Sequence, residues 1–157
     1  MIRFFPKIFA RAHCDIPCGV YEPTLAKIAA KTVARMVEQL EKLSMPKNLK
    51  DKTSFLQYSN HIARRITVKE EHAQLCKKEL SVLWSDFFKN QHLEKFPQLH
   101  DTFWQAEKLC SQNKQEVNVE AAQKLVDLVD EIAHIFYEVK DVPQRYEAYK
   151  EITDKLY

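Results

Sequence analysis

The chain has 157 residues, a formal net charge of +2 and a single glycine. This length suffices for one domain whose core needs neither disulfides nor a structural metal. Because tight hairpins and bulges depend on glycine, one glycine argues against a β-rich fold. No basic stripe typical of a nucleic-acid binder is present, and no apolar run approaches the about 20 residues of a membrane span. We therefore expect neither a nucleic-acid partner nor a membrane partner.

The first segment, residues 1–12, is MIRFFPKIFARA, which is basic and aromatic and contains no acid. The letters ARA imitate the small-x-small pattern before a signal-peptidase cut, but Pro6 and Lys7 interrupt the apolar part and leave no h-region of about 7–15 residues. We interpret residues 1–12 as a leader that is removed on maturation. A secretion signal and a frayed terminus that is never cut are the alternatives.

The next segment, residues 13–22, is HCDIPCGVYE and holds two of the four cysteines and the only glycine. Thiolates and imidazole are ligands that late first-row metals accept, so His13, Cys14 and Cys18 are candidate ligands of one ion. Pro17 fixes φ, and Gly19 permits the positive φ with which a short loop can turn back. We interpret this segment as a metal-binding hook.

Periodic apolar residues predict amphipathic helices over 23–43, 52–89, 97–112 and 118–140. The second segment lacks glycine and proline, so we expect one long helix rather than two. The tail, residues 141–157, has room for a short fifth helix. The predicted fold is all-α: an antiparallel four-helix bundle over residues 23–140, preceded by the N-terminal metal-binding hook.

Other thiol motifs fit the cysteines less well. A thioredoxin-type site needs C-x-x-C, whereas Cys14 and Cys18 are separated by three residues. A structural zinc site needs four ligands, and the remaining cysteines lie in apolar stripes of predicted helices. Packing is the expected role of four residues at core spacing, namely Cys76, Trp84, Trp104 and Cys110. The same structural interpretation applies to His61, His92, His100 and His134.

The hook sequence HCDIPCGVYEP (13–23) resembles the nickel hook of the nickel superoxide dismutase family. The resemblance continues in VKEEHAQLCKKELSVLWSDFFKNQHLEKFPQLHDTFWQAEKLCS (68–111) and in HIFYEVK (134–140). It implies superoxide as the substrate, one nickel ion per subunit as the cofactor, a homohexamer, a maturation protease that cuts before His13, and a cytoplasmic location.

The resemblance also implies roles for the hook residues. The amino nitrogen of His13, the backbone nitrogen of Cys14 and the thiolates of Cys14 and Cys18 would form a square plane around nickel. The imidazole of His13 would be the axial ligand of Ni(III). Tyr21 matches a tyrosine that closes the axial approach to the metal. Asp15 and Pro17 match positions that order the loop, where the proline is usually cis.

Outside the hook, Lys89 matches a lysine at the mouth of the site, where its charge would attract superoxide. In the family, a glutamate and an arginine hold the axial histidine in place. By alignment, Ala29 stands at the position of the glutamate and His72 at that of the arginine. A second tyrosine aligns with Phe87. His72 could replace the arginine, or it could be an ordinary histidine on a helix face.

Three other functions fit parts of the sequence. A thiol/disulfide redox or metal-binding helical protein would use Cys14 and Cys18 but leaves His13, Tyr21 and the leader unexplained. A ferritin-type di-iron bundle needs two Glu-x-x-His motifs, and only Glu131 and His134 form one. A structural helical partner protein explains only the bundle. We therefore predict a nickel superoxide dismutase that alternates Ni(II) and Ni(III) and is active after cleavage before His13.

Overall fold

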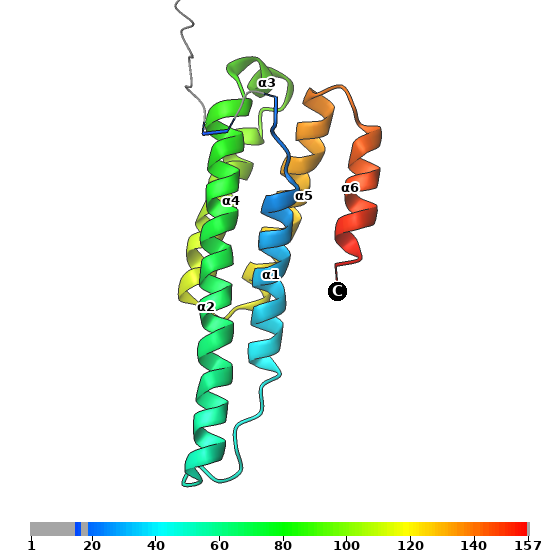
Figure 1. The fold of residues 1–157 in the computed structure, drawn as a ribbon. Helices are drawn as coiled ribbons and strands as arrows, with labels where there is room; N and C mark the ends of the chain where they lie inside the picture. Colours follow the sequence, from blue (N-terminus) through cyan, green and yellow to red (C-terminus); the bar gives the residue numbers. More distant parts are fainter. Residues whose placement is uncertain (1–14, 17–18, 157) are drawn as a thin grey trace, which may run out of the picture.

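The computed structural model describes residues 15–16 and 19–156, and every regular element of these residues is helical. The four long helices are α1 (Thr24–Glu41), α2 (Lys52–Val82), α4 (Leu99–Gln115) and α5 (Val119–Val139). They run antiparallel to one another in chain order, and α1 and α4 each pack against both α2 and α5 (Figure 1). The predicted antiparallel four-helix bundle is thus confirmed.

Three shorter elements complete the chain: the π-helical turn η1 (Leu83–Phe87), α3 (Asn90–Lys95) and α6 (Gln144–Asp154). The turn η1 continues α2 directly, so the single long helix expected over 52–89 exists as α2 and η1 together. Helix α3 lies in a stretch predicted as a connection, because six residues are too few to show an apolar period. Helix α6 follows α5 after a sharp turn and packs against α5 and α1.

Short polar residues set the ends of the helices. The Asp51 carboxylate accepts from the backbone N–H of Thr53 at the start of α2, and Asn118 caps α5 through the N–H of Ala121. After α5 the chain turns at Asp141, whose φ is 57°. Asp is one of the residues that tolerate this left-handed conformation, which glycine usually supplies.

The centre of the bundle lies among small side chains of α1 and larger ones of the other helices. Ala26, Ala29 and Ala30 are fully buried, which brings the α1 backbone close to its neighbours. The larger fully buried side chains include Leu80, Leu99, Leu125, Val129, Ile132 and Phe136. The buried Tyr21 joins this core, and Ile16 packs against it.

The expected packing role holds for three of the four residues assigned to it. Cys76 and Cys110 are fully buried, and Trp84 is half-buried against the ring of Phe103. Trp104 is 57% exposed, so its assignment to the core is wrong. It follows the inward-facing Phe103 on α4, and a rotation of about 100° per residue turns it to the surface, where Lys108 lies over its ring.

Candidate metal centre

The four hook residues His13, Cys14, Pro17 and Cys18 lie outside the described residues. Their described neighbours Asp15, Ile16 and Gly19 define where the hook joins the bundle. This junction lies at the end of the bundle where α3 is found (Figure 1). Among residues 15–16 and 19–156, no three His, Cys, Asp or Glu side chains gather closely enough to hold a metal ion.

The hook is fixed to the bundle at the π-helical turn. The backbone N–H of Asp15 donates to Oδ2 of Asp86 over 2.8 Å, and Asp86 lies within η1. A π-helical turn holds one more residue than an α-helical turn, and such turns are frequent at functional sites. Ile16 packs against the core next to this anchor. The turn therefore presents a carboxylate to the hook at the point where α2 ends.

Gly19 provides the backbone reversal that follows Cys18. Its φ is +94°, and a Cβ built on it would meet no atom within 4 Å. The glycine is thus required by the backbone conformation and not by lack of space. This is the positive φ expected of Gly19 from the sequence; its role in shaping a metal hook stays a prediction.

Tyr21 lies at the base of the hook, where only 7% of it is exposed. Its ring centroid is 5.7 Å from that of Phe87 on η1, and the Phe87 ring is 4.5 Å from that of Phe136 on α5. Phe87 therefore lies beside Tyr21, in agreement with its alignment to a second tyrosine near the site. Because phenylalanine has no hydroxyl, this wall of the site is apolar.

The chain that leaves the hook is held by Glu22, a residue to which the sequence assigned no role. Its carboxylate accepts hydrogen bonds from the Tyr137 hydroxyl and, over 3.0 Å, from Oγ1 of Thr24. Arg145 of α6 adds an ion pair at 3.4 Å. Burial and the neighbouring Glu22 carboxylate raise the pKa of Tyr137, so this hydroxyl keeps its proton and donates.

Lys89 is exposed and lies three residues after Asp86, at the start of α3. It helps to line a cavity of about 250 Å³ together with Trp84, Ser85, Phe88, Asn90 and Leu93. Its backbone N–H donates to Nδ1 of His92 over 3.1 Å. Burial and the positive charge of Lys89 lower the pKa of His92, so this imidazole is mainly neutral near pH 7. Among the described residues that line this cavity, Lys89 is the only one with a positive charge.

His72 lies away from the hook anchor. His72 is half-buried, and its Nδ1 lies 2.9 Å from the carbonyl oxygen of Val68, one turn earlier on α2. It precedes Asp86 by fourteen residues of continuous helix, a separation of about 20 Å. Ala29 is fully buried in the bundle. The helix length therefore keeps His72 far from the Asp86 anchor of its own chain.

Sequence reasoning missed Asp86 and Glu22, which fix the two ends of the hook. Both are single acids without a spacing pattern, and their role depends on contacts with residues 71 and 115 positions away. Asp86 lies in the stretch SDFFK, which carries part of the family resemblance. That stretch was the one available signal for the anchor.

Comparisons with known proteins agree with this geometry. The sequence model of the family described as nickel-containing superoxide dismutase matches residues 9–140. Superoxide dismutase [Ni] of Streptomyces coelicolor is 38% identical over 138 residues, which cover 87% of this chain and 95% of that protein. Superoxide dismutase [Ni] of Streptomyces seoulensis is 39% identical over 138 residues, with the same coverage of both proteins.

Solved structures give the same result for the fold. A native nickel superoxide dismutase structure is 36% identical with a TM-score of 0.67, covering 82% of this chain and 99% of that chain. A nickel-containing superoxide dismutase structure after partial reduction has a TM-score of 0.68 at the same identity and coverage. The residues that the family model matches, 9–140, include the hook, its anchor and all four long helices. This chain belongs to the nickel-containing superoxide dismutase family.

Proposed function

We propose that this chain converts superoxide to hydrogen peroxide and dioxygen, with one nickel ion held by His13, Cys14 and Cys18. The observation that carries the proposal is the way the described hook residues are held on the bundle. The N–H of Asp15 is hydrogen-bonded to Asp86, Gly19 has a positive φ, and the ring of Tyr21 is buried. Two thiolates, an imidazole and an amino nitrogen form a donor set that suits nickel. The bound ion supplies one-electron redox chemistry by alternating between Ni(II) and Ni(III).

The surrounding residues have distinct tasks in this proposal. Asp86 fixes the hook through Asp15, and Pro17 restricts its backbone. Tyr21 and Phe87 cover one side and limit access to small species such as superoxide. Lys89 attracts the anionic substrate from solvent.

Activation requires removal of residues 1–12 by a maturation protease. As long as the bond between Ala12 and His13 is intact, the nitrogen of His13 is a peptide nitrogen and not an amine. Cleavage therefore creates one ligand of the proposed set. The leader lacks an uninterrupted h-region, which supports an enzyme that stays in the cytoplasm. None of the described helices is both long enough and apolar enough to span a membrane.

We also propose a homohexamer, as the family resemblance implies. The separation of about 20 Å between His72 and Asp86 is relevant here. Fourteen residues of continuous helix separate His72 from the Asp86 anchor of its own chain. We therefore propose that His72 serves the axial histidine of a neighbouring subunit.

The test compares two nickel-reconstituted proteins: the chain that begins at His13 and the full-length chain. We expect dismutation and bound nickel in the shortened chain alone. A His13→Ala version of the shortened chain should lose the activity. Equal activity in both chains would show that the amino group of His13 is not a ligand. Absence of nickel from both, with Cys14 and Cys18 forming a reversible disulfide, would favour a thiol redox protein instead.

A further inference from the structure

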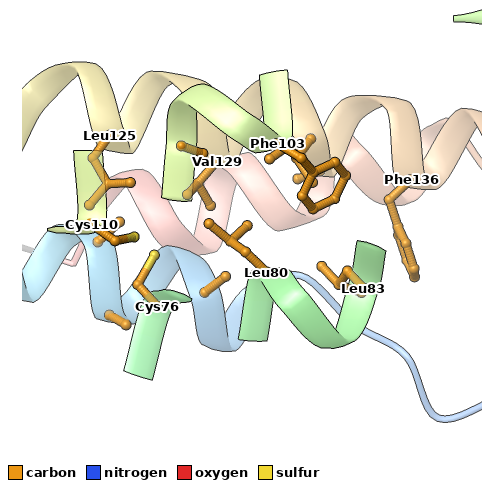
Figure 2. Close-up of a cluster of buried hydrophobic side chains, with 14 of the residues drawn as sticks. Cys76, Leu80, Leu83, Phe103, Cys110, Leu125, Val129 and Phe136 are labelled. Carbon is orange, nitrogen blue, oxygen red and sulfur yellow. The ribbon is translucent and has the colours of Figure 1, made fainter. Parts of the chain in front are cut away.

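Two thiols that the proposed reaction does not use face each other inside the bundle. Cys76 comes from α2 and Cys110 from α4, which pack together, and both side chains are 0% exposed. Figure 2 shows their sulfur atoms pointing toward one another below Leu125, beside Leu80. Both are free thiols in the structure. Their juxtaposition is thus a property of the folded bundle, since 34 positions separate them in sequence.

The environment of the pair determines which reagents it can meet. A hydrogen bond with Cys110 and burial raise the pKa of Cys76, so this thiol is protonated near pH 7 and reacts little with bulky thiol reagents. Hydrogen peroxide is small and uncharged, and it is the product of the proposed reaction. Cys76 precedes the anchor residue Asp86 by ten residues of continuous helix, or about 15 Å. Peroxide released at the hook would therefore have about 15 Å to travel along the helix to reach Cys76.

We propose that Cys76 and Cys110 form a modification site: peroxide oxidises them to a buried disulfide that links α2 to α4. One cysteine loses its proton and its thiolate attacks peroxide, which breaks the O–O bond; the leaving hydroxide takes up the proton, so that a sulfenic acid and one water result. The second thiol displaces hydroxide from that sulfur, and the protons released complete a second water. Two sulfurs are oxidised and both peroxide oxygens are reduced, so the step needs no further reactant.

The cross-link has a structural consequence that can be measured. A disulfide that closes a loop of 34 residues restricts the unfolded chain, and the folded bundle already holds both sulfurs together. For a domain of this size the expected rise in Tm is about 10 °C. The enzyme would thus become more heat-resistant under the peroxide that it produces. The source of the oxidant rests on the proposed function, whereas the pairing of the thiols does not.

The experiment treats the nickel-free, full-length folded protein with hydrogen peroxide and maps the tryptic peptides. The dose is set as the one that converts the exposed Met45 to its sulfoxide. We expect peptides 70–77 and 109–114 to be joined by a bond that a reductant cleaves. The hook cysteines share peptide 12–27, so their own disulfide is seen separately.

Matched variants identify the origin of the heat resistance. In the double variant Cys76→Ala and Cys110→Ala, the hook can still oxidise, but Tm should not rise with peroxide. Cys76 and Cys110 recovered as free thiols at the stated dose would overturn the proposal, as would a linked pair without a rise in Tm. Because dismutation plays no part in this experiment, a failure of the proposed enzymatic function would leave its result unchanged. If added peroxide links the pair but sustained superoxide turnover by the nickel-loaded enzyme does not, the assigned oxidant source is wrong.

Discussion

Gly19 sets the direction in which the chain leaves the hook. Its φ of +94° is costly for any residue with a Cβ, although the space around it is open. A substitution at this position therefore tests backbone strain alone, because an added Cβ would not clash with any neighbouring atom.

We expect Gly19→Ala to weaken nickel binding. The left-handed conformation costs an L-residue about 1–2 kcal/mol, which corresponds to a loss of roughly 5–30-fold in affinity if the bound hook alone requires it. Nickel titration of the chain beginning at His13 measures this loss. Val20→Ala, next in sequence and exposed, is the control. Equal affinities would show that the turn at Gly19 is not needed for binding.

Asp86 is the second residue whose effect can be isolated. Asp86→Ala removes the acceptor for the N–H of Asp15, whereas Asp86→Asn keeps an oxygen at that place. Because the bond is solvent-exposed, we expect a cost of about 1 kcal/mol, or roughly fivefold in nickel affinity, for the alanine variant and less for the asparagine variant. The same titration checks this order. Unchanged affinity in both variants would mean that the anchor does not shape the hook.

The sequence predicted the site residues unevenly, and the reason lies in distance along the chain. His13, Cys14 and Cys18 stand within six residues, so their chemistry and the turn at Gly19 could be predicted from local pattern. The anchor at Asp86 could not, because one carboxylate without a spacing pattern does not indicate which distant N–H it will meet.

At the level of elements, α6 is the addition that the family match does not cover, since the match ends at residue 140. The helix is joined to the bundle through Asp130 of α5, which accepts from the Tyr149 hydroxyl at 3.0 Å and from Nζ of Lys150 at 2.8 Å. The same carboxylate pairs with Nζ of the buried Lys27 of α1 at 2.5 Å. One acid thus connects three helices.

Tyr149 is expected to contribute most of the packing of α6, because only 4% of it is exposed. Tyr149→Ala should lower the free energy of unfolding by about 3–5 kcal/mol, as for other buried aromatic residues. Tyr149→Phe keeps the ring and loses only the hydrogen bond to Asp130, for about 1–2 kcal/mol. Urea unfolding measures both. Equal losses in the two variants would assign the stabilisation to the hydrogen bond and not to the ring.

The Asp130 junction also predicts a dependence of stability on pH. Burial alone would raise the pKa of Asp130, but hydrogen bonds from Lys150 and Lys27 outweigh it and lower the pKa below its usual value. A lowered carboxyl pKa stabilises the fold above the unfolded value of about 3.9, and this contribution is lost as the pH falls through the folded pKa.

The difference in unfolding free energy between the natural chain and Asp130→Asn should therefore be full at pH 6 and shrink below about pH 4. Urea unfolding over this range measures it. Asp127→Asn, which removes an exposed carboxylate one turn earlier on α5, is the matched control. A difference for Asp130→Asn that stays constant down to pH 3 would contradict the lowered pKa.

The helices themselves were the predictable part of the fold. Apolar periods over many turns identified the four long helices, because burial of one face requires that pattern whatever the partner. The widened turn η1 has no such signature, since it changes the backbone over only five residues. Trp104 has core spacing on α4 but faces outward, because the sequence does not show how wide the buried face is.

At the level of the whole molecule, the balance of charge changes with the leader. The full chain has a formal charge of +2, and the three basic residues Arg3, Lys7 and Arg11 precede His13. Side chains from residue 13 onwards therefore sum to −1. Superoxide is an anion, so the proposed mature enzyme gains nothing from its overall charge and depends on local positive groups near the hook.

Lys89 is suited to that task, because it is exposed and lies three residues after the hook anchor. In the nickel-loaded chain, Lys89→Gln should lower kcat/KM by up to about tenfold at low salt, the lower end of the range for electrostatic steering. Since the Debye length is about 10 Å at 0.1 M salt, the natural chain should slow as salt is added, and the variant should respond less. Lys155→Gln, just beyond α6, removes the same charge away from the hook and serves as the control. If the two variants have equal rates and equal salt dependence, the change in rate results from the net charge of the protein and not from the position of Lys89.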